Sequence, residues 1–390
     1  MDAGDADELL QWKSGEGSRV NDARIFMPTW RKFKRTAFQC GLYEAQDVLQ
    51  DVDDVDLIGL DPGRGFRFKE SWQRRLLWRD ITKRLVWVNP GLQPVRLKQD
   101  YEAFILVCQS WWDLLYVNAI NGWKDRCRTS ICYIEEMWAR YLPLYRHWIH
   151  ALNQFDHIVL GMKGSVEAVE RAIGRRCHYV PGAVDAVRFS PYPRPPNRVI
   201  DVYSIGRRWQ GVHQSLLKLS ARGDLFYMYD TLFGADSEAS NHRQHRELLA
   251  NLAKRSRYFM VAPAKMNVEN DTGGQVEVGY RYFEAAGAGA VMIGQAARCH
   301  AFSELFNWPD AVIEIKPDGS DVADVLGSLA AEPERLEEIS RRNAAQTLLR
   351  HDWAYRWKMI LNIAGLQPGA AMEGRERRLR ELAGMAQAAG

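Results

Sequence analysis

From about residue 23 onward, short apolar runs alternate with helical patterns in this 390-residue sequence, and a proline-rich segment interrupts the alternation once. Such alternation is typical of parallel sheets with helical crossovers. Four of the six residues at 191–196 are proline. They make a stiff, extended linker by composition, although a surface loop within one domain would also account for them. We therefore expect an α/β protein with two Rossmann-like, doubly wound domains facing each other across a cleft.

The apolar runs predict two series of strands. The first series is at residues 24–27, 57–60, 104–108, 130–134, 157–160 and 178–180, and the second is at 200–205, 225–229, 258–261, 291–293 and 312–315. Ligands of such sheets bind outside the carboxyl ends of the strands. The turn at Gly206 and the segment 273–284 both lie at that edge, so we expect the functional site there.

Length and composition narrow the class of protein. The chain is long enough for two domains with substantial cores, and a net charge of +3 gives no global electrostatic argument for nucleic acid. Six cysteines form no Cys-x-x-Cys pair and no metal-ligand spacing, which fits a reducing cytoplasm. The acidic residues 1–8 contain no apolar run and do not form a signal peptide. We expect a cytoplasmic protein without a metal.

Residues 273–293 carry the most informative pattern of the chain. Two glycines open a loop, a helix begins near Gly279 with Arg281 and Glu284 one turn apart, and an apolar run follows at 291–293. The free N–H groups and the dipole of a helix N-terminus suit an anion such as a diphosphate, and a carboxylate in the next turn can accept hydrogen bonds from sugar hydroxyls. The alternative is a Gly/Ala-rich helix that only packs against a sheet.

Three further motifs occur in a consistent order. They are the Pro- and Gly-containing exit from a strand at 179–185 followed by 188–191, the strand 200–205 that ends in Gly206 and Arg207, and an aromatic helical pattern at 351–361. Together with 273–284, these motifs resemble the donor-nucleotide site and closing helix of GT-B glycosyltransferases, especially retaining family 4. The match extends over residues 155–361.

The resemblance implies a domain organisation and an activity. It implies an acceptor domain at 1–187, a nucleotide-sugar donor domain at 188–350 and a closing helix at 351–366 that crosses back to the N-terminal domain. The tail at 367–390 is rich in Ala, Gly, Arg and Glu, and this composition indicates either an amphipathic helix or disorder. The implied enzyme is a hexosyltransferase-like glycosyltransferase of carbohydrate biosynthesis. It moves a sugar with retention from a nucleotide-sugar co-substrate to a glycan, lipid-linked glycan or small molecule, with no metal, other cofactor or nucleic acid. The alternatives are a nucleotide-sugar epimerase and a catalytically weak nucleotide-sugar binding protein.

The resemblance also assigns roles to residues, with two departures from the family pattern. Arg207 would neutralise phosphate charge and Glu284 would bind ribose hydroxyls. The first family glutamate falls on Val276, and Glu277 could reach the donor sugar after a short loop adjustment. The lysine that usually precedes the next glycine is Gln210 here. The predicted catalytic residues are Glu277, Arg207 and Glu136, and the predicted donor-binding residues are Gly206, Arg207, Arg208, Lys265, Gly279, Tyr280, Arg281 and Glu284.

The first half of the chain offers less specific candidates. Glu135 and Glu136 follow an apolar run, so that one could point into the cleft as the base an inverting enzyme needs; alternatively, they are an acidic pair at a helix N-terminus. Arg31 and Lys32 could touch donor phosphate or acceptor. Residues 67–84 predict a basic amphipathic helix, which would either contact an anionic membrane at its inner face or pack as an ordinary domain helix.

Overall fold

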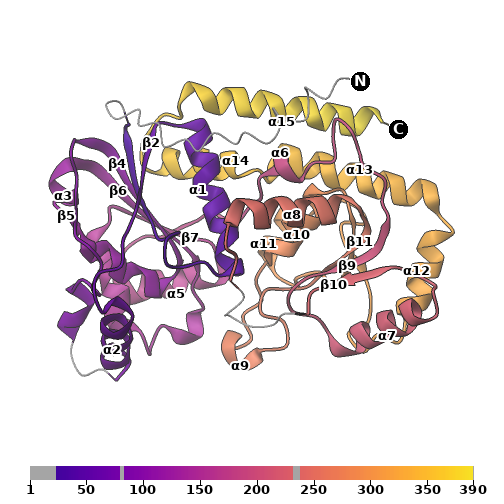
Figure 1. Ribbon diagram of the computed structural model, residues 1–390, viewed down its shortest axis with the longest axis horizontal. Helices are drawn as coiled ribbons and strands as arrows, with labels where there is room; N and C mark the ends of the chain where they lie inside the picture. The colour runs from indigo at the N-terminus through magenta and orange to yellow at the C-terminus, as the bar shows by residue number, and fades with distance from the viewer. Residues whose placement is uncertain (1–22, 80–82, 232–237, 390) are drawn as a thin grey trace.

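The computed structural model describes residues 23–79, 83–231 and 238–389, and contains two parallel sheets with helices packed on them (Figure 1). The acidic segment 1–8 and residues 80–82 of the basic segment lie outside the described residues. The two sheets follow each other along the chain, so the α/β architecture predicted from the sequence is confirmed. Among the described residues, no helix has the length and apolarity needed to cross a membrane.

The first sheet has six strands in the order β2-β1-β4-β6-β7-β8, and every neighbouring pair is parallel. Each strand of the first predicted series falls on one of these strands. Their bounds are β1 Ile25–Thr29, β2 Val55–Gly59, β4 Tyr101–Ser110, β6 Cys127–Glu136, β7 His157–Leu160 and β8 His178–Tyr179. A parallel pair, β3 Val95–Arg96 and β5 Ile120–Asn121, was not predicted, because two residues are too few to show a period.

The second sheet has five parallel strands in the order β10-β9-β11-β12-β13. All five fall on the second predicted series. Their bounds are β9 Ile200–Ser204, β10 Tyr227–Tyr229, β11 Ser256–Val261, β12 Val291–Gly294 and β13 Ile313–Glu314. The strands are apolar and mostly buried on both faces, as expected for a parallel sheet covered by helices.

Helices connect the strands. The α-helices of the first half are α1 Cys40–Val52, α2 Phe66–Trp78, α3 Trp123–Arg126, α4 Arg146–Ile149, α5 Val166–Ile173 and α6 Ala186–Phe189. Those of the second half are α7 Gln210–Ala221, α8 His242–Lys254, α9 Glu269–Thr272, α10 Tyr280–Gly287, α11 His300–Leu305, α12 Val322–Ala330, α13 Pro333–Arg350, α14 Trp353–Ile363 and α15 Ala370–Ala388. The 3-10 helices are η1 Ala37–Gln39, η2 Lys83–Trp87, η3 Trp111–Ala119, η4 Ala139–Tyr141, η5 His150–Gln154 and η6 Lys163–Ser165.

The closing helix predicted near residue 351 is α14, and it packs on the first sheet. Trp353, Trp357 and Leu361 are buried in one apolar cluster with residues of β1, β4 and α1. The Trp357 indole also donates a 2.7 Å hydrogen bond to the backbone oxygen of Ala45 in α1. Thus α14 crosses back to the N-terminal sheet, whereas the predicted domain boundaries themselves stay predictions.

The C-terminal tail forms α15, a long helix that lies along both halves of the molecule, in yellow in Figure 1. Its Leu379, Leu382 and Ala383 are buried in the apolar cluster of the second sheet. Of the two alternatives for the tail, the structure therefore shows the helix.

The burial of α14 predicts a large loss of stability when its indole is removed. We expect Trp357→Ala to lower the free energy of unfolding by about 3–5 kcal/mol, because it leaves a cavity between α14 and α1 and removes the hydrogen bond to Ala45. Met359 on the same helix is 42% exposed, so Met359→Ala is a matched control that should change stability by less than about 0.5 kcal/mol. Equal effects in urea unfolding would contradict the burial of this helix face.

Candidate functional site

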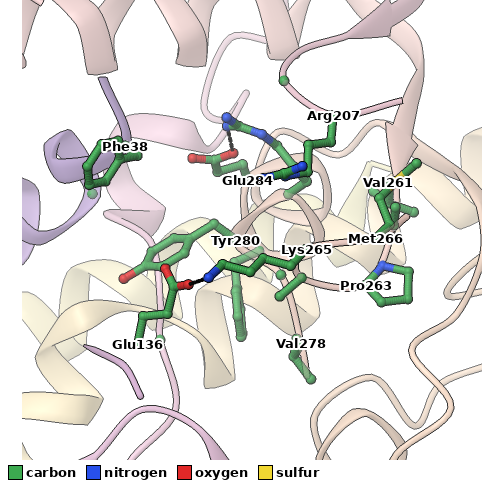
Figure 2. A pocket seen from close by; sticks show the side chains of 18 of the residues that line it. Phe38, Glu136, Arg207, Val261, Pro263, Lys265, Met266, Val278, Tyr280 and Glu284 are labelled. Carbon is green, nitrogen blue, oxygen red and sulfur yellow. Dashed lines mark hydrogen bonds and ion pairs between the residues drawn. The ribbon is translucent and has the colours of Figure 1, made fainter. Parts of the chain in front are cut away.

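A cavity of about 280 Å³ lies between the two sheets (Figure 2). On one side it is lined by residues at or just after the carboxyl ends of β4, β6 and β7, and by the start of α1. On the other side it is lined by the loops after β9 and β11 and by α10. The cavity therefore lies at the carboxyl edge of both sheets, where ligands of doubly wound sheets bind.

The structure brings nine of the ten predicted site residues to this cavity. Those that line it are Glu136, Gly206, Arg207, Arg208, Lys265, Gly279, Tyr280, Arg281 and Glu284. Proximity to the cavity does not by itself test their roles, which stay predictions.

Glu277 is the predicted residue that the structure does not bring to the cavity. Its carboxylate is 3% exposed and accepts hydrogen bonds from the N–H of Gly164 at 2.8 Å and from the Gln275 amide at 2.6 Å. Gln275 in turn accepts a hydrogen bond from the N–H of Ala139 and donates one to Ser165. Glu277 thus ties the loop before α10 to the N-terminal half, and its predicted role toward the donor sugar stays a prediction.

The turn after β9 places two arginines at the cavity. Gly206 has a φ of 83°, a backbone conformation that suits glycine, and its N–H donates to Asp230 at 3.0 Å. Arg208 forms an ion pair with the same Asp230. Arg207 is exposed and has no ion-pair partner in the described part of the chain. Arg207 is therefore available to an anionic ligand, whereas Arg208 is held by a carboxylate.

Lys265 and Glu136 join the two walls of the cavity. Lys265 follows β11 and forms a 2.8 Å ion pair with Glu136 at the end of β6, which Figure 2 shows as a dashed line. The ammonium of Lys265 also lies 5.2 Å from the centre of the Trp138 ring. Glu135 and Glu136 are the last two residues of a strand, so the alternative of a helix N-terminal pair is wrong.

The N-terminus of α10 faces the cavity, as the sequence pattern predicts. Gly279 is its N-cap residue, and a side chain there would approach the backbone oxygen of Ala262 to 3.0 Å. The ring of Tyr280 extends to the other half, because a β-carbon on Gly41 or Gly182 would lie within 3.4 Å of it. The N–H of Tyr282 donates to the backbone oxygen of Gly279 at 3.4 Å. The N–H groups of Tyr280 and Arg281 before it have no carbonyl partner within the helix, so they can bind an anion.

Glu284 is the most strongly held carboxylate of the site. It is 1% exposed and pairs with both Arg246 of α8 and Arg281 of α10. Burial alone would raise the pKa of Glu284, but the two guanidinium groups outweigh burial and lower the pKa to about 2. Arg246 also donates to Glu44 of α1 at 2.8 and 3.0 Å. A buried Glu44–Arg246–Glu284–Arg281 network thus connects the first helix to the helix at the cavity.

Several residues at the cavity were not predicted. Arg246 and His245 lie inside α8 without a motif around them, and Gln109 lies near the end of β4. Burial and the charges of Arg246 and Arg281 lower the pKa of His245, which keeps its imidazole neutral. Only the knowledge that the end of β4 lies beside the end of β6 could have singled out Gln109.

Other candidates lie elsewhere. Arg31 is paired with Asp47 at 2.7 Å beside a second cavity of about 370 Å³, and Lys32 is paired with the exposed Asp61. Neither residue lines the first cavity. In residues 23–79, 83–231 and 238–389, no three His, Cys, Asp or Glu side chains form a group that could hold a metal ion.

The ion pairs of Glu284 predict an acid-sensitive contribution to stability. Its folded-state pKa is lowered from 4.5 to about 2, so the stabilisation is complete above the unfolded pKa and is lost as the pH falls from about 4.5 to 2. The shift corresponds to about 3 kcal/mol. We expect Glu284→Gln to be less stable at pH 7 and to show a smaller loss between pH 5 and 2. Exposed Glu373→Gln should match wild type in urea unfolding across this range, and a wild-type pH profile for Glu284→Gln would contradict the ion-pair account.

One family model and several solved structures are similar to this chain. Residues 198–362 match a family model described as glycosyl transferase-like. The search of curated proteins found no match.

Similar solved structures extend over nearly the whole chain. HepE of Anabaena in complex with UDP and glucose has 11% sequence identity and a TM-score of 0.51, with 88% of this chain and 100% of that chain covered. The T4 alpha-glucosyltransferase in complex with UDP has 10% identity and a TM-score of 0.51, with the same shares covered. A complex of alpha-glucosyltransferase with UDP and a 13-mer DNA has 10% identity and a TM-score of 0.52, with 88% and 99% covered.

These similarities agree with the sequence prediction in part. At such identities the solved structures establish the fold, and the family match covers residues 198–362, which contain Arg207 and α10. Neither comparison selects retaining family 4, which stays a prediction. The family match and the fold together identify the chain as a glycosyltransferase of the GT-B fold.

Proposed function

We propose that this glycosyltransferase uses a UDP-sugar as its donor and transfers the sugar, with retention, to an acceptor hydroxyl. The single observation that carries the proposal is the placement of exposed Arg207 and the N-terminus of α10 at one cavity between the two sheets. The complexes of HepE with UDP and glucose and of alpha-glucosyltransferase with UDP support uracil as the donor base. The acceptor is a glycan, a lipid-linked glycan or a small molecule.

In the proposed mechanism the diphosphate lies between Arg207 and the first turn of α10. The guanidinium of Arg207, the side chain of Arg281 and the backbone N–H groups after Gly279 neutralise the charge that develops as the sugar leaves. Arg208 supports this site through Asp230, which orients the turn. These groups perform the charge stabilisation without a metal or another cofactor.

Glu284 is proposed to bind the ribose without losing its arginine partners. An ionised carboxylate has about four acceptor positions on its two oxygens. The ion pairs with Arg246 and Arg281 use only part of this capacity, and Glu284 is among the residues that line the cavity. Because both arginines fix the carboxylate, it is already oriented before the donor binds.

The N-terminal wall of the cavity is the side formed by residues at or just after the ends of β4, β6 and β7. Two carboxyl groups on this wall support retention, because one is ion-paired and the other has a raised pKa. Glu136 is engaged by Lys265 at 2.8 Å. Burial, the largest influence, and the neighbouring charge of Glu136 raise the pKa of Glu135 well above its usual range, which favours the neutral acid. Neither is the free carboxylate that an inverting enzyme needs as a base. We propose that the leaving phosphate takes the acceptor's proton, and that Glu136 and Glu277 act by positioning Lys265 and the loop before α10.

We also propose that the protein is cytoplasmic and contacts an anionic membrane through α2. Phe66, Gln73 and Leu77 form its buried face, as in an ordinary domain helix. The opposite face nevertheless exposes Phe68, Trp72 and Trp78 at 68%, 48% and 50% beside basic side chains. Exposed aromatic rings next to cations suit an interface with anionic lipids.

The donor site predicts a specific loss of nucleotide affinity. We expect Arg207→Ala to weaken UDP binding by about tenfold, because one charge-assisted contact to phosphate is removed. Isothermal titration calorimetry without added metal measures this change. Arg222 is exposed at the end of α7 and does not line the cavity, so Arg222→Ala should bind UDP as wild type does. Equal UDP affinity in wild type and Arg207→Ala would remove the phosphate assignment.

Product analysis of wild type with UDP-glucose distinguishes the proposed function from its rivals. A glycosyltransferase is expected to release UDP slowly, with free α-glucose as the first product when water replaces the acceptor. Conversion of the bound sugar to an epimer would indicate an epimerase. Binding without any release of UDP would indicate a binding protein.

The membrane proposal predicts that flotation depends on the exposed aromatic residues. Wild type is expected to float with phosphatidylglycerol vesicles at low salt, and Phe68→Ser/Trp72→Ser to remain at the bottom of the gradient. Leu248 and Met385 are 60% and 42% exposed on other helices, so Leu248→Ser/Met385→Ser is the matched control and should float. Failure of wild type to float would leave α2 as an ordinary domain helix.

A further inference from the structure

Buried polar atoms without hydrogen-bond partners gather at the N-terminal wall of the cavity. Among the described residues they include the amide oxygen of Gln109, both carboxyl oxygens of Glu135, which have only the neighbouring Gln109 amide within reach, and the hydroxyl of Tyr280. All three residues line the cavity, and Gln109 and Glu135 are only 9% and 7% exposed. Buried polar groups in proteins almost always have a partner, so a cluster of unsatisfied ones at a cavity indicates that a ligand completes it.

The fold places the first two of these groups next to each other. Cys108 pairs with Ile134 and Ser110 pairs with Glu136 in the parallel register of β4 and β6. Gln109 and Glu135 therefore lie side by side at the carboxyl ends of adjacent central strands. Tyr280 reaches the same region from α10, where its ring packs against Gly41 and Gly182.

The chemistry of this cluster matches sugar hydroxyl groups. Burial and the charge of Glu136 raise the pKa of Glu135 and outweigh the opposing influence of Gln109 and Arg246. A neutral carboxyl group both donates and accepts hydrogen bonds, as a tyrosine hydroxyl does, and an amide oxygen accepts them. A hydroxyl group also donates and accepts. The cluster is therefore suited to a neutral, hydroxylated ligand and unsuited to a phosphate.

We propose that Gln109, Glu135 and Tyr280 bind the hydroxyl groups of the donor's sugar. This inference rests on the proposed function, because it takes the diphosphate to lie at the N-terminus of α10. Tyr280 is the first residue of that helix, so a sugar joined to the diphosphate lies within reach of its hydroxyl. Sugar recognition is thereby assigned to the N-terminal wall, and Glu277, held at Gly164, is not needed for it.

Calorimetric titration with UDP and with UDP-glucose tests the assignment in wild type, Glu135→Gln and Glu135→Leu. Glutamine keeps a donor and an acceptor, whereas leucine has a similar volume and neither. We expect Glu135→Leu to bind UDP-glucose at least about tenfold more weakly than wild type does, with UDP affinity unchanged within about twofold. Glu135→Gln should retain most of the UDP-glucose affinity. Gln109→Leu should act in the same direction as Glu135→Leu.

The Tm of the ligand-free variants shows whether weaker UDP-glucose binding comes from a lost contact or from a folding defect. Leucine in place of an unpartnered buried carboxyl group is expected to leave the Tm of Glu135→Leu unchanged or higher. Unchanged UDP-glucose affinity in Glu135→Leu, or an equal loss for UDP and UDP-glucose, would overturn the assignment while leaving the proposed function in place. Failure of wild type to bind either nucleotide would contradict the proposed function itself, and this inference with it.

Discussion

The site depends on one buried guanidinium group, that of Arg246, which lies between carboxylates from both halves of the chain. Arg246 donates to Glu44 of α1, 202 residues away in sequence, and pairs with Glu284 of α10. Glu44 also accepts hydrogen bonds from the N–H of Asp185 and from the side chain of Arg188, which lie in the segment that connects the two sheets. Removal of one partner from such a buried network leaves an uncompensated charge. The network therefore fixes α10 relative to α1, and with it the position of the helix N-terminus at the cavity.

Two kinds of group line the cavity, and they lie on opposite walls. The C-terminal wall carries Arg207, Arg281 and a helix N-terminus, which suit negative charge. The N-terminal wall carries one ion-paired carboxylate, that of Glu136, beside the polar side chains of Gln109 and Glu135, which lie at adjacent strand ends. The ion pair of Lys265 with Glu136 joins the two walls. This division matches a donor with a charged diphosphate and an uncharged sugar, and it explains why unsatisfied polar atoms are retained there at a cost in stability.

Much of the fold could be predicted from the sequence, because its signals are local. Apolar runs bounded by turn residues show the strands, and glycines 206 and 279 mark backbone turns at the strand edge. The components of the site that depend on tertiary packing could not be predicted. Arg246 lies inside an amphipathic helix, and its importance arises from Glu44 and Glu284, which are distant in sequence. The register of β4 against β6, which places Gln109 beside Glu135, also could not be predicted from the sequence. Glu277, one residue after the position that the family spacing selects, shows the converse, because the fold holds its carboxylate at Gly164 and Gln275, outside the lining of the cavity.

The structure of the protein crystallised with UDP would test the central claim most directly. The account predicts the diphosphate at the first turn of α10 with Arg207 in contact, the ribose near Glu284, and the Glu44–Arg246–Glu284 network unchanged. A nucleotide bound elsewhere on the protein, or a cavity that stays empty at saturating UDP, would contradict the assignment of this cavity as the donor site.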